Sequence, residues 1–300
     1  MNDAGRSELA RINSRLKEKM LRWLPEPELL STAVEGLRLS RRDEPDRIEN
    51  CFSEPGVGVI VQGFKRSVIG SEEFCYGANQ CMVAGVDMPS SFSVVGASPE
   101  QPFLAVALVL DKVLITRLAA ETPLAPGPGK GSCKGISVVD VDPGVLDAFL
   151  RLVELLDKPG QIPVLAPMIV REIHYRLLIG PQGGHLRSLN TLGTQSNQIA
   201  QAINWLRQNY REPLQVDELA RRVHMATSTF HRHFKEVTTL SPLQFHKRLR
   251  LYEAQRLMLA ESENATGAAL AVGYESPTQF NREYKRLFGD SPHRDVSRLR

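Results

Sequence analysis

The chain has 300 residues, of which 42% are hydrophobic, and it is long enough for two globular domains with separate cores. Its apolar runs are too short to span a membrane and residues 1–22 are polar, unlike a signal peptide, so we expect a cytoplasmic protein without a membrane partner. The net charge of +3 is uneven: residues 196–300 carry 16 Lys and Arg against 11 Asp and Glu, and the remainder carries 21 against 23. This distribution favours a phosphate-binding surface in the last third of the chain.

The first half of the chain changes from a helical to a strand-like pattern. Residues 5–24 predict an amphipathic helix that ends before Pro25. After a charged turn at 40–50, short runs rich in β-branched residues cover 57–61, 64–69, 80–85, 91–95 and 103–110. Several short strands at this spacing predict a small barrel or sandwich, and residues 111–121 then predict a helix.

Residues 123–135 are predicted to be a connecting loop. The glycines around Lys130 invite comparison with a phosphate-binding loop, but their spacing is wrong for that motif and nearby prolines disrupt its strand-to-helix context. Two helices follow, one with an apolar stripe from Leu146 to Leu156 and one at about 165–179. They offer more apolar surface than a small barrel needs, so both core packing and a homodimer interface remain open. Residues 180–196 are predicted to be a linker, and a helix at about 197–209 opens the next domain.

Residues 272–292 predict a turn followed by one short helix. Ser276 suits the N-cap, Pro277 the first helical position, and Gln279 can complete a capping box. Gly289 suits the C-terminal cap. One face of this helix is apolar, with Phe280, Tyr284, Leu287 and Phe288, and the opposite face carries Thr278, Asn281, Arg282 and Lys285. Such a polar stripe can read base edges in a major groove, although a solvated surface helix has the same pattern.

A second copy of this unit favours the DNA-binding interpretation. Within residues 219–242, Phe230, Arg232 and Lys235 match Phe280, Arg282 and Lys285 at an offset of 50. An internal repeat of a helix-turn-helix is much more specific than one copy. The first unit departs from the second at its cap, where Ala226 replaces serine and Thr227 is an alternative cap.

The two units are joined by a predicted helix over 243–260, which contains neither Gly nor Pro. At 1.5 Å per residue this helix is about 27 Å long. A rod of that length can place two recognition helices in successive major grooves, about 34 Å apart.

Residues 196–300 therefore resemble the DNA-binding domain of the AraC/XylS family of bacterial transcription regulators. The resemblance rests on motifs such as Phe234-Lys235, Ser241-Pro242, Val272-Gly273-Tyr274 and Phe288-Gly289. It implies two helix-turn-helix units, at about 214–238 and about 265–289, that bind double-stranded promoter DNA. It also implies base-reading roles for residues on the two exposed stripes, namely Ser228, Thr229, His231, Arg232, Lys235, Thr278, Gln279, Asn281, Arg282 and Lys285.

The first half of the chain resembles one AraC subgroup, through residues 56–63 and 165–183. This resemblance implies a cupin-like β-barrel with helices over 1–190, including a helical part at about 140–180, that senses a small-molecule effector and forms a homodimer. The fold class expected for the whole chain is thus α+β, with an all-α second domain. An N-terminal domain that serves only as a dimerisation or protein-interaction platform is the alternative. RNA polymerase is a further candidate partner.

Enzymatic and metal-binding sites find little support. A metal-dependent cupin needs histidines on its strands, but the first domain has only His174 and His185, and neither lies in the strand-like region. His231 and His233 point apart on a helix. We therefore predict no enzyme activity, no metal and no cofactor. No Cys-x-x-Cys motif occurs among the cysteines, Cys51, Cys75, Cys81 and Cys133. The simpler expectation is that these thiols are buried. The alternative is a thiol sensor of oxidants or electrophiles, for which Cys75 and Cys81 are the nearest pair in sequence.

Overall fold

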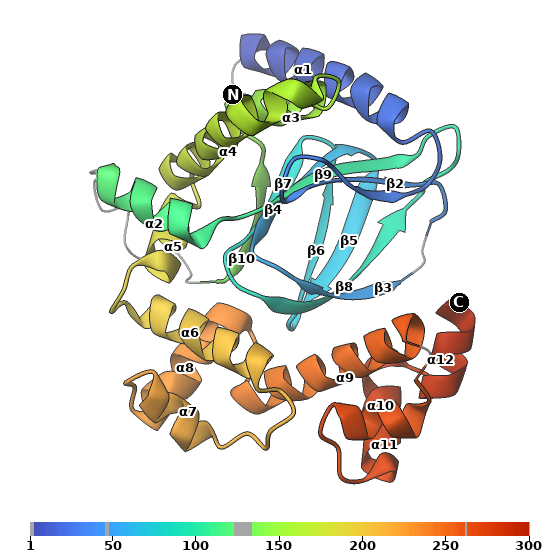
Figure 1. Cartoon of the computed structure of the whole chain (residues 1–300), viewed down its shortest axis with the longest axis vertical. Coiled ribbons are helices and arrows are strands. Elements are labelled where there is room, and N and C mark those ends of the chain that lie inside the picture. Colours follow the sequence, from blue (N-terminus) through green and yellow to red (C-terminus); the bar gives the residue numbers. More distant parts are fainter. Residues whose placement is uncertain (1–2, 46–47, 123–133, 262, 300) are drawn as a thin grey trace.

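The computed structural model describes residues 3–45, 48–122, 134–261 and 263–299, and most of the loop predicted at 123–135 lies outside these ranges. Two antiparallel sheets form a barrel-like centre, with helices above and below it (Figure 1). This arrangement confirms the predicted α+β class, with a sheet domain followed by a helical domain. Among the described residues, no helix is both long enough and apolar enough to cross a membrane.

The larger sheet has the strand order β1-β2-β9-β4-β7-β10 and the smaller has the order β3-β8-β5-β6. The strands are β1 (Leu29–Ser31), β2 (Leu37–Arg42), β3 (Glu49–Ser53), β4 (Gly56–Gln62), β5 (Phe64–Ile69), β6 (Glu72–Gly77), β7 (Gln80–Ala84), β8 (Met88–Val95), β9 (Phe103–Val109) and β10 (Ile136–Asp140). Alternate residues of β9 point to opposite sides: Val106 packs with the helices outside the sheet, and Ala105 packs with residues of the smaller sheet.

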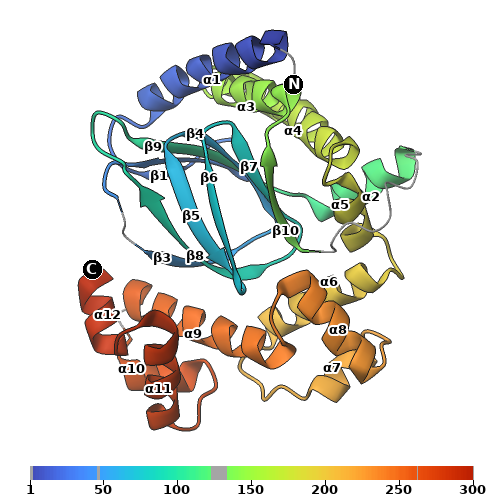
Figure 2. The ribbon, with the colours of Figure 1, turned by 180° about the vertical axis from the view of Figure 1, so that it is seen from behind.

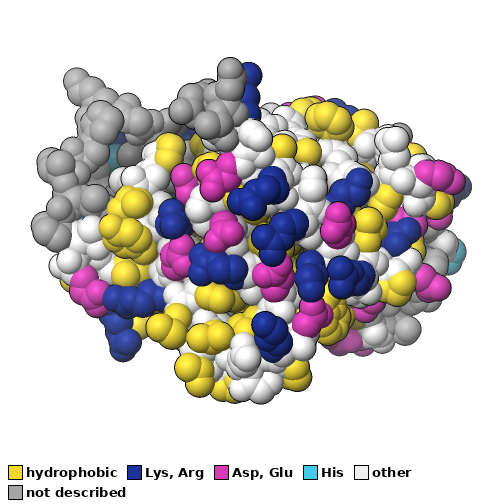
Figure 3. All heavy atoms as spheres, turned by 90° about the horizontal axis from the view of Figure 1, so that it is seen from above, with side chains coloured by type: hydrophobic (Ala, Val, Ile, Leu, Met, Phe, Trp, Pro, Cys, Tyr) yellow, Lys and Arg dark blue, Asp and Glu magenta, His cyan; other side chains and the backbone are white. Residues whose placement is uncertain are grey.

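The helices of the first domain are α1 (Asp3–Trp23), α2 (Lys112–Glu121), α3 (Pro143–Leu155), the 3₁₀ turn η1 (Pro159–Gln161), α4 (Ile162–Ile179) and α5 (Gly183–Asn190). Buried leucines of α1 and α3 cover the outer face of the larger sheet. Arg15 and Lys19 of α1 pair with Glu154 and Asp157 at the end of α3. Figure 3 shows the molecule from above, where α1 and α3 lie. On this surface the positive and negative side chains of the described residues are intermingled and form no continuous basic patch.

The second domain is helical throughout the described residues. It comprises α6 (Gln195–Gln208), α7 (Val216–Arg222), α8 (Thr227–Thr238), α9 (Pro242–Ala260), α10 (Ala265–Ala271), α11 (Pro277–Phe288) and α12 (Pro292–Leu299). Phe230 and Phe234 of α8 pack with α6 in one core, and Phe280 and Tyr284 of α11 pack with α10 in another. The long helix α9 joins both cores and runs beneath β3 and β8 (Figure 2).

Several elements differ from the sequence prediction. The predicted linker at 180–196 contains α5, because Leu186 and Leu189 bury themselves in the cores of the first domain and of α6 and α8. The predicted charged turn at 40–50 instead ends β2 and begins β3. The last two residues of β2 are half-buried arginines that pair with acids, Arg41 with Asp43 and Arg42 with Glu49. Pairing across strands, which a local pattern does not show, decides these elements.

The two domains share a hydrophobic core, in which Val86 and Met88 of the first domain pack with α6 and α8, and polar and aromatic contacts add to it. Phe52 of β3 meets Phe245 of α9 edge to face, with ring centroids 5.7 Å apart. Arg207 of α6 lies over the same Phe52 ring and pairs with Asp87, whose side chain is buried. At the turn between β5 and β6, the Ser71 N–H donates to the Thr239 hydroxyl over 2.9 Å. These contacts and the shared core hold the second domain against the first.

Acidification will destabilise this fold. His246 is 4% exposed, and burial, together with the charge of Arg250, lowers its pKa to about 4, although a bond to the Tyr210 carbonyl opposes the shift. Because the unfolded histidine titrates near 6.5, the unfolded state takes up the proton first, and stability is lost as the pH falls from about 6.5 to about 4. We expect His246 alone to contribute up to about 3 kcal/mol of this loss. Urea unfolding between pH 7 and pH 4 measures it.

The variant His246→Gln keeps a donor for the Tyr210 carbonyl but does not titrate. Its unfolding free energy should fall less steeply over the same pH range than that of the natural chain. Equal slopes for the two proteins would contradict the assignment to His246.

Candidate nucleic-acid interface

The cap of α11 explains why this helix starts where it does. The Ser276 hydroxyl accepts from the Gln279 N–H over 3.3 Å, and Pro277 follows at the first position. The predicted capping box is only half formed, because the Gln279 side chain donates to Glu283 instead of reaching back. Gly289 ends the helix in the left-handed conformation, with φ of +84°, as its position predicts.

The cap of α8 is weaker. Ala226 occupies the N-cap without a side-chain bond, and the Thr227 hydroxyl donates to Asp217 of α7 rather than capping the helix. At the other end Thr239 takes the left-handed conformation that Gly289 takes in α11, with φ of +60°. A β-branched residue rarely adopts this conformation, and here it is held in place by bonds to Ser71 of the first domain. The C-terminal end of α8 is therefore coupled to the barrel.

The structure brings the predicted base-reading residues onto the solvent side of α8 and α11. Nine of the ten are exposed, and the other, Thr229, is half-buried. The opposite faces are buried, with Phe230, Phe234, Phe280 and Tyr284 each at 0% exposure. Each helix thus presents one polar stripe while its aromatic residues anchor it to the core behind.

Most of these polar side chains are not engaged in the protein. Among the described residues, no hydrogen bond or ion pair is seen for the side chains of Lys235, Asn281, Arg282 or Lys285. The Arg232 Nε lies 3.9 Å from the Glu236 Oε1 in an exposed ion pair. Such a pair is weak, so a phosphate or a base could replace Glu236 as the partner of Arg232. Arg286, also exposed in the last turn of α11, was not among the predicted residues, although its position one residue after Lys285 could have suggested it.

The relative placement of the two units depends on Arg250 of α9. Its guanidinium donates to the carbonyl oxygens of Tyr210, Arg211 and Glu212 before α7, at 2.6 to 2.9 Å. The same group donates to the Gly273 carbonyl in the turn before α11, over 3.0 Å. One side chain therefore ties the loop of the first unit to the turn of the second.

Gly273 makes this arrangement possible. Its φ is +89°, and a Cβ added there would lie 2.2 Å from the Arg211 carbonyl oxygen. Only glycine allows both the backbone conformation and this close approach. Behind the second stripe, Glu283 is fixed by Lys247 at 2.9 Å and by the Tyr274 hydroxyl at 2.8 Å. These contacts hold α11 rigidly against α9.

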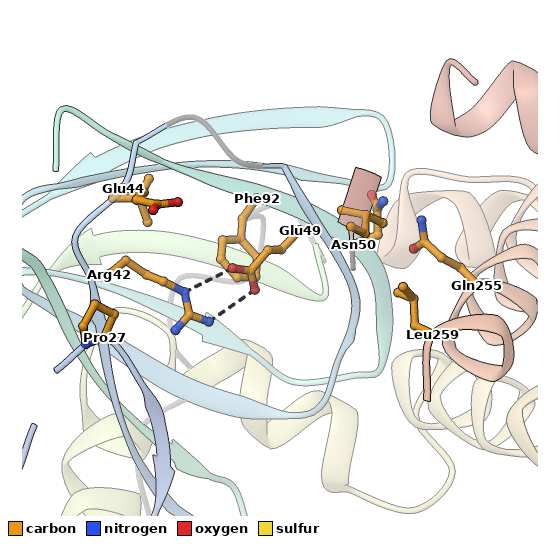
Figure 4. Close-up of a pocket in the computed structure, with 10 residues that line it drawn as sticks. Pro27, Arg42, Glu44, Glu49, Asn50, Phe92, Gln255 and Leu259 are labelled. Carbon is orange, nitrogen blue, oxygen red and sulfur yellow. Dashed lines mark hydrogen bonds and ion pairs between the residues drawn. The ribbon is translucent and has the colours of Figure 1, made fainter. Parts of the chain in front are cut away.

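Two open cavities lie at and beside the boundary between the two domains. One, of about 540 Å³, lies between the barrel and α9, with Asn50 on one side and Gln255 and Leu259 on the other (Figure 4). The other, of about 350 Å³, lies inside the barrel. Both are lined by Arg42, Glu49 and Phe92, so the Arg42–Glu49 ion pair stands where the two cavities meet.

The candidate sensor cysteines are not brought together. Cys75 is exposed on β6 in the smaller sheet, whereas Cys81 lies on β7 in the larger sheet and is 3% exposed. Burial raises the pKa of the Cys81 thiol to about 12, which keeps it protonated and unreactive. Cys133 lies outside the described residues.

Of the two histidines of the first domain, His174 is hydrogen-bonded to the backbone and His185 is largely removed from water. His174 accepts from the Asp111 N–H over 2.9 Å through Nε2, and its Nδ1 lies 2.8 Å from the Val170 carbonyl, so the ring is neutral and joins α4 to the start of α2. Burial lowers the pKa of His185 to about 4. Within the described ranges, no group of three or more acidic, histidine or cysteine side chains is placed to hold a metal.

Comparison with known proteins agrees with this geometry. A family model described as the AraC-type transcriptional regulator N-terminus matches residues 33–185, and a helix-turn-helix domain model matches residues 219–297. The regulator ArgR of Pseudomonas aeruginosa is 25% identical over 169 residues, which cover 56% of this chain and 48% of ArgR. The activator RhaS of Yersinia pestis is 32% identical over 98 residues, covering 33% of this chain and 36% of RhaS. The matched regions thus span half or less of these relatives.

Similar folds occur among solved structures. ToxT of Vibrio cholerae, with a bound butenoic acid derivative, superposes with a TM-score of 0.58 at 10% identity, over 88% of this chain and 98% of that one. An apo ToxT variant gives a TM-score of 0.56 over 89% of this chain and 98% of its own. At this identity the likeness concerns the fold alone. The AraC-type model matches about half of the chain, residues 33–185, and the helix-turn-helix model matches residues 219–297. The protein therefore belongs to the AraC-type transcriptional regulators.

Proposed function

We propose that this regulator binds promoter DNA sequence-specifically, with α8 and α11 in adjacent major grooves. Residues 196–300 would be the DNA-binding domain, and residues 1–190 the sensing and dimerisation domain. The observation that carries the proposal is the pair of exposed stripes at equivalent positions of a repeated unit, joined by a 19-residue helix and tied together by Arg250. At 1.5 Å per residue α9 is about 28 Å long, close to the spacing of successive major grooves.

The first expectation concerns Arg282. If its guanidinium bonds two acceptors of one guanine, Arg282→Ala should cost about 1–3 kcal/mol on the natural operator and much less on operators altered at that base pair. Binding of the two proteins to a set of single-base operator variants, at one fixed salt concentration, measures this difference. Arg256→Ala is the matched control, because Arg256 is exposed on α9 away from both stripes and pairs with Glu253. Uniform weakening on every operator would leave Arg282 only a phosphate contact.

The N-terminal domain, in this proposal, responds to a small molecule. The barrel cavity has a volume within the usual range of ligand sites and a mostly apolar lining. ToxT structures have been solved with an unsaturated fatty acid and with a synthetic carboxylic acid bound, so a related fold accepts small organic ligands. A barrel filled with side chains would instead have favoured a pure dimerisation platform. An effector can act only by binding one arrangement of the two domains better than another.

Such a response requires the domains to be coupled, and Arg207 is the strongest polar link described above. We expect Arg207→Ala to leave the buried Asp87 carboxylate without its partner and to lose the contact with Phe52. Calorimetry should then resolve two melting transitions in place of one, with the lower one shifted by several degrees. Arg222→Ala, which removes an arginine that lies over Trp205 within the second domain, should leave a single transition. A single unshifted transition for Arg207→Ala would argue against coupling at this point.

We also propose a homodimer formed through α4. Val164, Met168, Tyr175 and Ile179 follow one another at spacings of four, seven and four residues, so they lie on one face of the helix, and all are exposed. A second copy presents the same apolar face, as a two-fold symmetric interface requires.

Met168→Glu would place a charge at the centre of this face. We expect it to raise the dimer dissociation constant at least tenfold, measured by sedimentation equilibrium, without lowering the melting temperature of the monomer. Leu192→Glu, at an apolar residue that is 81% exposed outside α4, is the control. An unchanged dissociation constant for Met168→Glu would move the interface elsewhere.

A further inference from the structure

The interior of the barrel contains one lysine, Lys65 of β5. Its neighbours across the ladder are Tyr76 of β6 and Val94 of β8, and both are buried in the core between the two sheets. The ammonium group lies 3.8 Å from the centre of the Phe92 ring. Lys65 is half-buried because its side chain borders the cavity. Removal from bulk water is the main cause that lowers its pKa.

The charges around this cavity do not balance. Its described lining has three cationic residues, Arg38, Arg42 and Lys65, and two carboxylates, Glu49 and Glu54. Arg42 binds both oxygens of Glu49, at 3.1 and 3.3 Å, and Arg38 binds Glu54 at 3.0 Å. Lys65 is the remaining cation, and no ion pair involving it occurs among the described residues. Lys65 has the Phe92 ring and the charge of Glu49 near it but no ion pair of its own. A cation removed from water without an ion-pair partner is costly, so an anion bound beside it would be favoured.

Most of the remaining lining is apolar, and part of it consists of small residues. Gly58 of β4 and Ala105 and Ala107 of β9 leave space along the larger sheet, because longer side chains there would fill the barrel. Ile60, Met82 and Phe103 line the cavity as well. A ligand that fits this lining needs an apolar body and one negative end.

We propose that the barrel cavity binds a small organic monocarboxylate, with its carboxylate on Lys65 and its apolar body against β4 and β9. The inference rests on the proposed effector response and names the chemical class of the effector. The charge balance limits the ligand to one negative charge, because both arginines already have carboxylate partners.

The same site has a direct structural connection to the DNA-binding domain through β3. Glu49, Cys51 and Phe52 of this strand all line the cavity, and the ring of Phe52 also packs against Phe245 of α9 and beneath Arg207. Phe92, which lies under the Lys65 ammonium, pairs with Glu49 across the β3–β8 ladder. Only β8 therefore separates β5, which carries Lys65, from β3, which contacts the second domain through Phe52.

The test uses the full chain and a matched set of probes. Straight-chain carboxylates of four to ten carbons are compared with the alcohols and amines of equal length, by thermal shift and by titration calorimetry. Carboxylates should raise the melting temperature and bind at least tenfold more tightly than the alcohols, and amines should have no effect. Failure of every carboxylate to bind, or equal binding of carboxylates and alcohols, would overturn the proposal.

Variants of Lys65 separate a ligand-binding role from a structural one. Lys65→Met should lose the preference for carboxylates over alcohols, Lys65→Arg should retain part of it, and Lys158→Met, at an exposed lysine, should behave as the natural chain. Without ligand, Lys65→Met should melt at the same or a higher temperature, because it removes an unpaired cation. A lower melting temperature would assign Lys65 a structural role and overturn the proposal.

The DNA-binding experiment distinguishes the two levels of inference. If Lys65→Met binds the operator as the natural chain does but no longer responds to carboxylate, both the proposed function and the ligand class stand. If carboxylates bind but the natural chain shows no sequence preference on DNA, the proposed function fails and the ligand site remains. If DNA binding is specific but Lys65→Met keeps the carboxylate response, the ligand class fails alone.

Discussion

The geometry of the second domain depends on one guanidinium group. Arg250 fills its donors with carbonyl oxygens from the loop before α7 and from the turn before α11, so the two helix-turn-helix units cannot turn independently about α9. The planar fork of arginine suits this role, since it reaches several acceptors in fixed directions where lysine would meet them as a point charge. Carbonyl oxygens left without this donor would lose hydrogen bonds in a half-buried interface, which explains why so many bonds converge on one residue.

A second consequence of simple geometry is the double role of β3. Its five residues include Glu49 and Cys51, which line the barrel cavity, and Phe52, which borders the same cavity and also packs against Phe245 of the second domain. The strand lies at the edge of the smaller sheet, where one of its two neighbours is absent. An edge strand moves more easily than a central one, since fewer ladder bonds restrain it. The barrel is thus joined to α6 and α9 of the second domain through a strand at its edge.

The repeated unit also shows how similar sequences are used differently. At the C-terminal end of α11, Gly289 takes the left-handed conformation without strain, whereas Thr239 takes it at the end of α8 only with bonds from Ser71. α8 therefore depends on the barrel for part of its stability, and α11 does not use this contact. The two units are similar in fold but differ in their connection to the first domain.

Local patterns were sufficient for the long helices and for the direction of their faces. Phe230, Phe234, Phe280 and Tyr284 predicted the buried side, and the exposure of the opposite stripes agrees. Patterns failed where partners distant in the chain decide the structure. The region of Arg42 and Glu49 has the local pattern of a charged turn, but the two side chains pair across the ends of two strands. The sequence of α5 has the local pattern of a linker, but its leucines are buried in two cores.

The sequence by itself indicated the family, through motifs that resemble those of AraC/XylS regulators. It also determined the repeat and which residues face outward on α8 and α11, because these follow from periodicity and short-range capping. Only the tertiary structure decided what lies around Lys65, how Arg250 ties the two units, and where the domains touch. Each of these depends on side chains that meet across strands or domains, at distances in sequence that no local pattern encodes. That Lys65 has no ion pair can be seen only from the three-dimensional structure, in which Arg38 and Arg42 pair with the two carboxylates of the cavity lining.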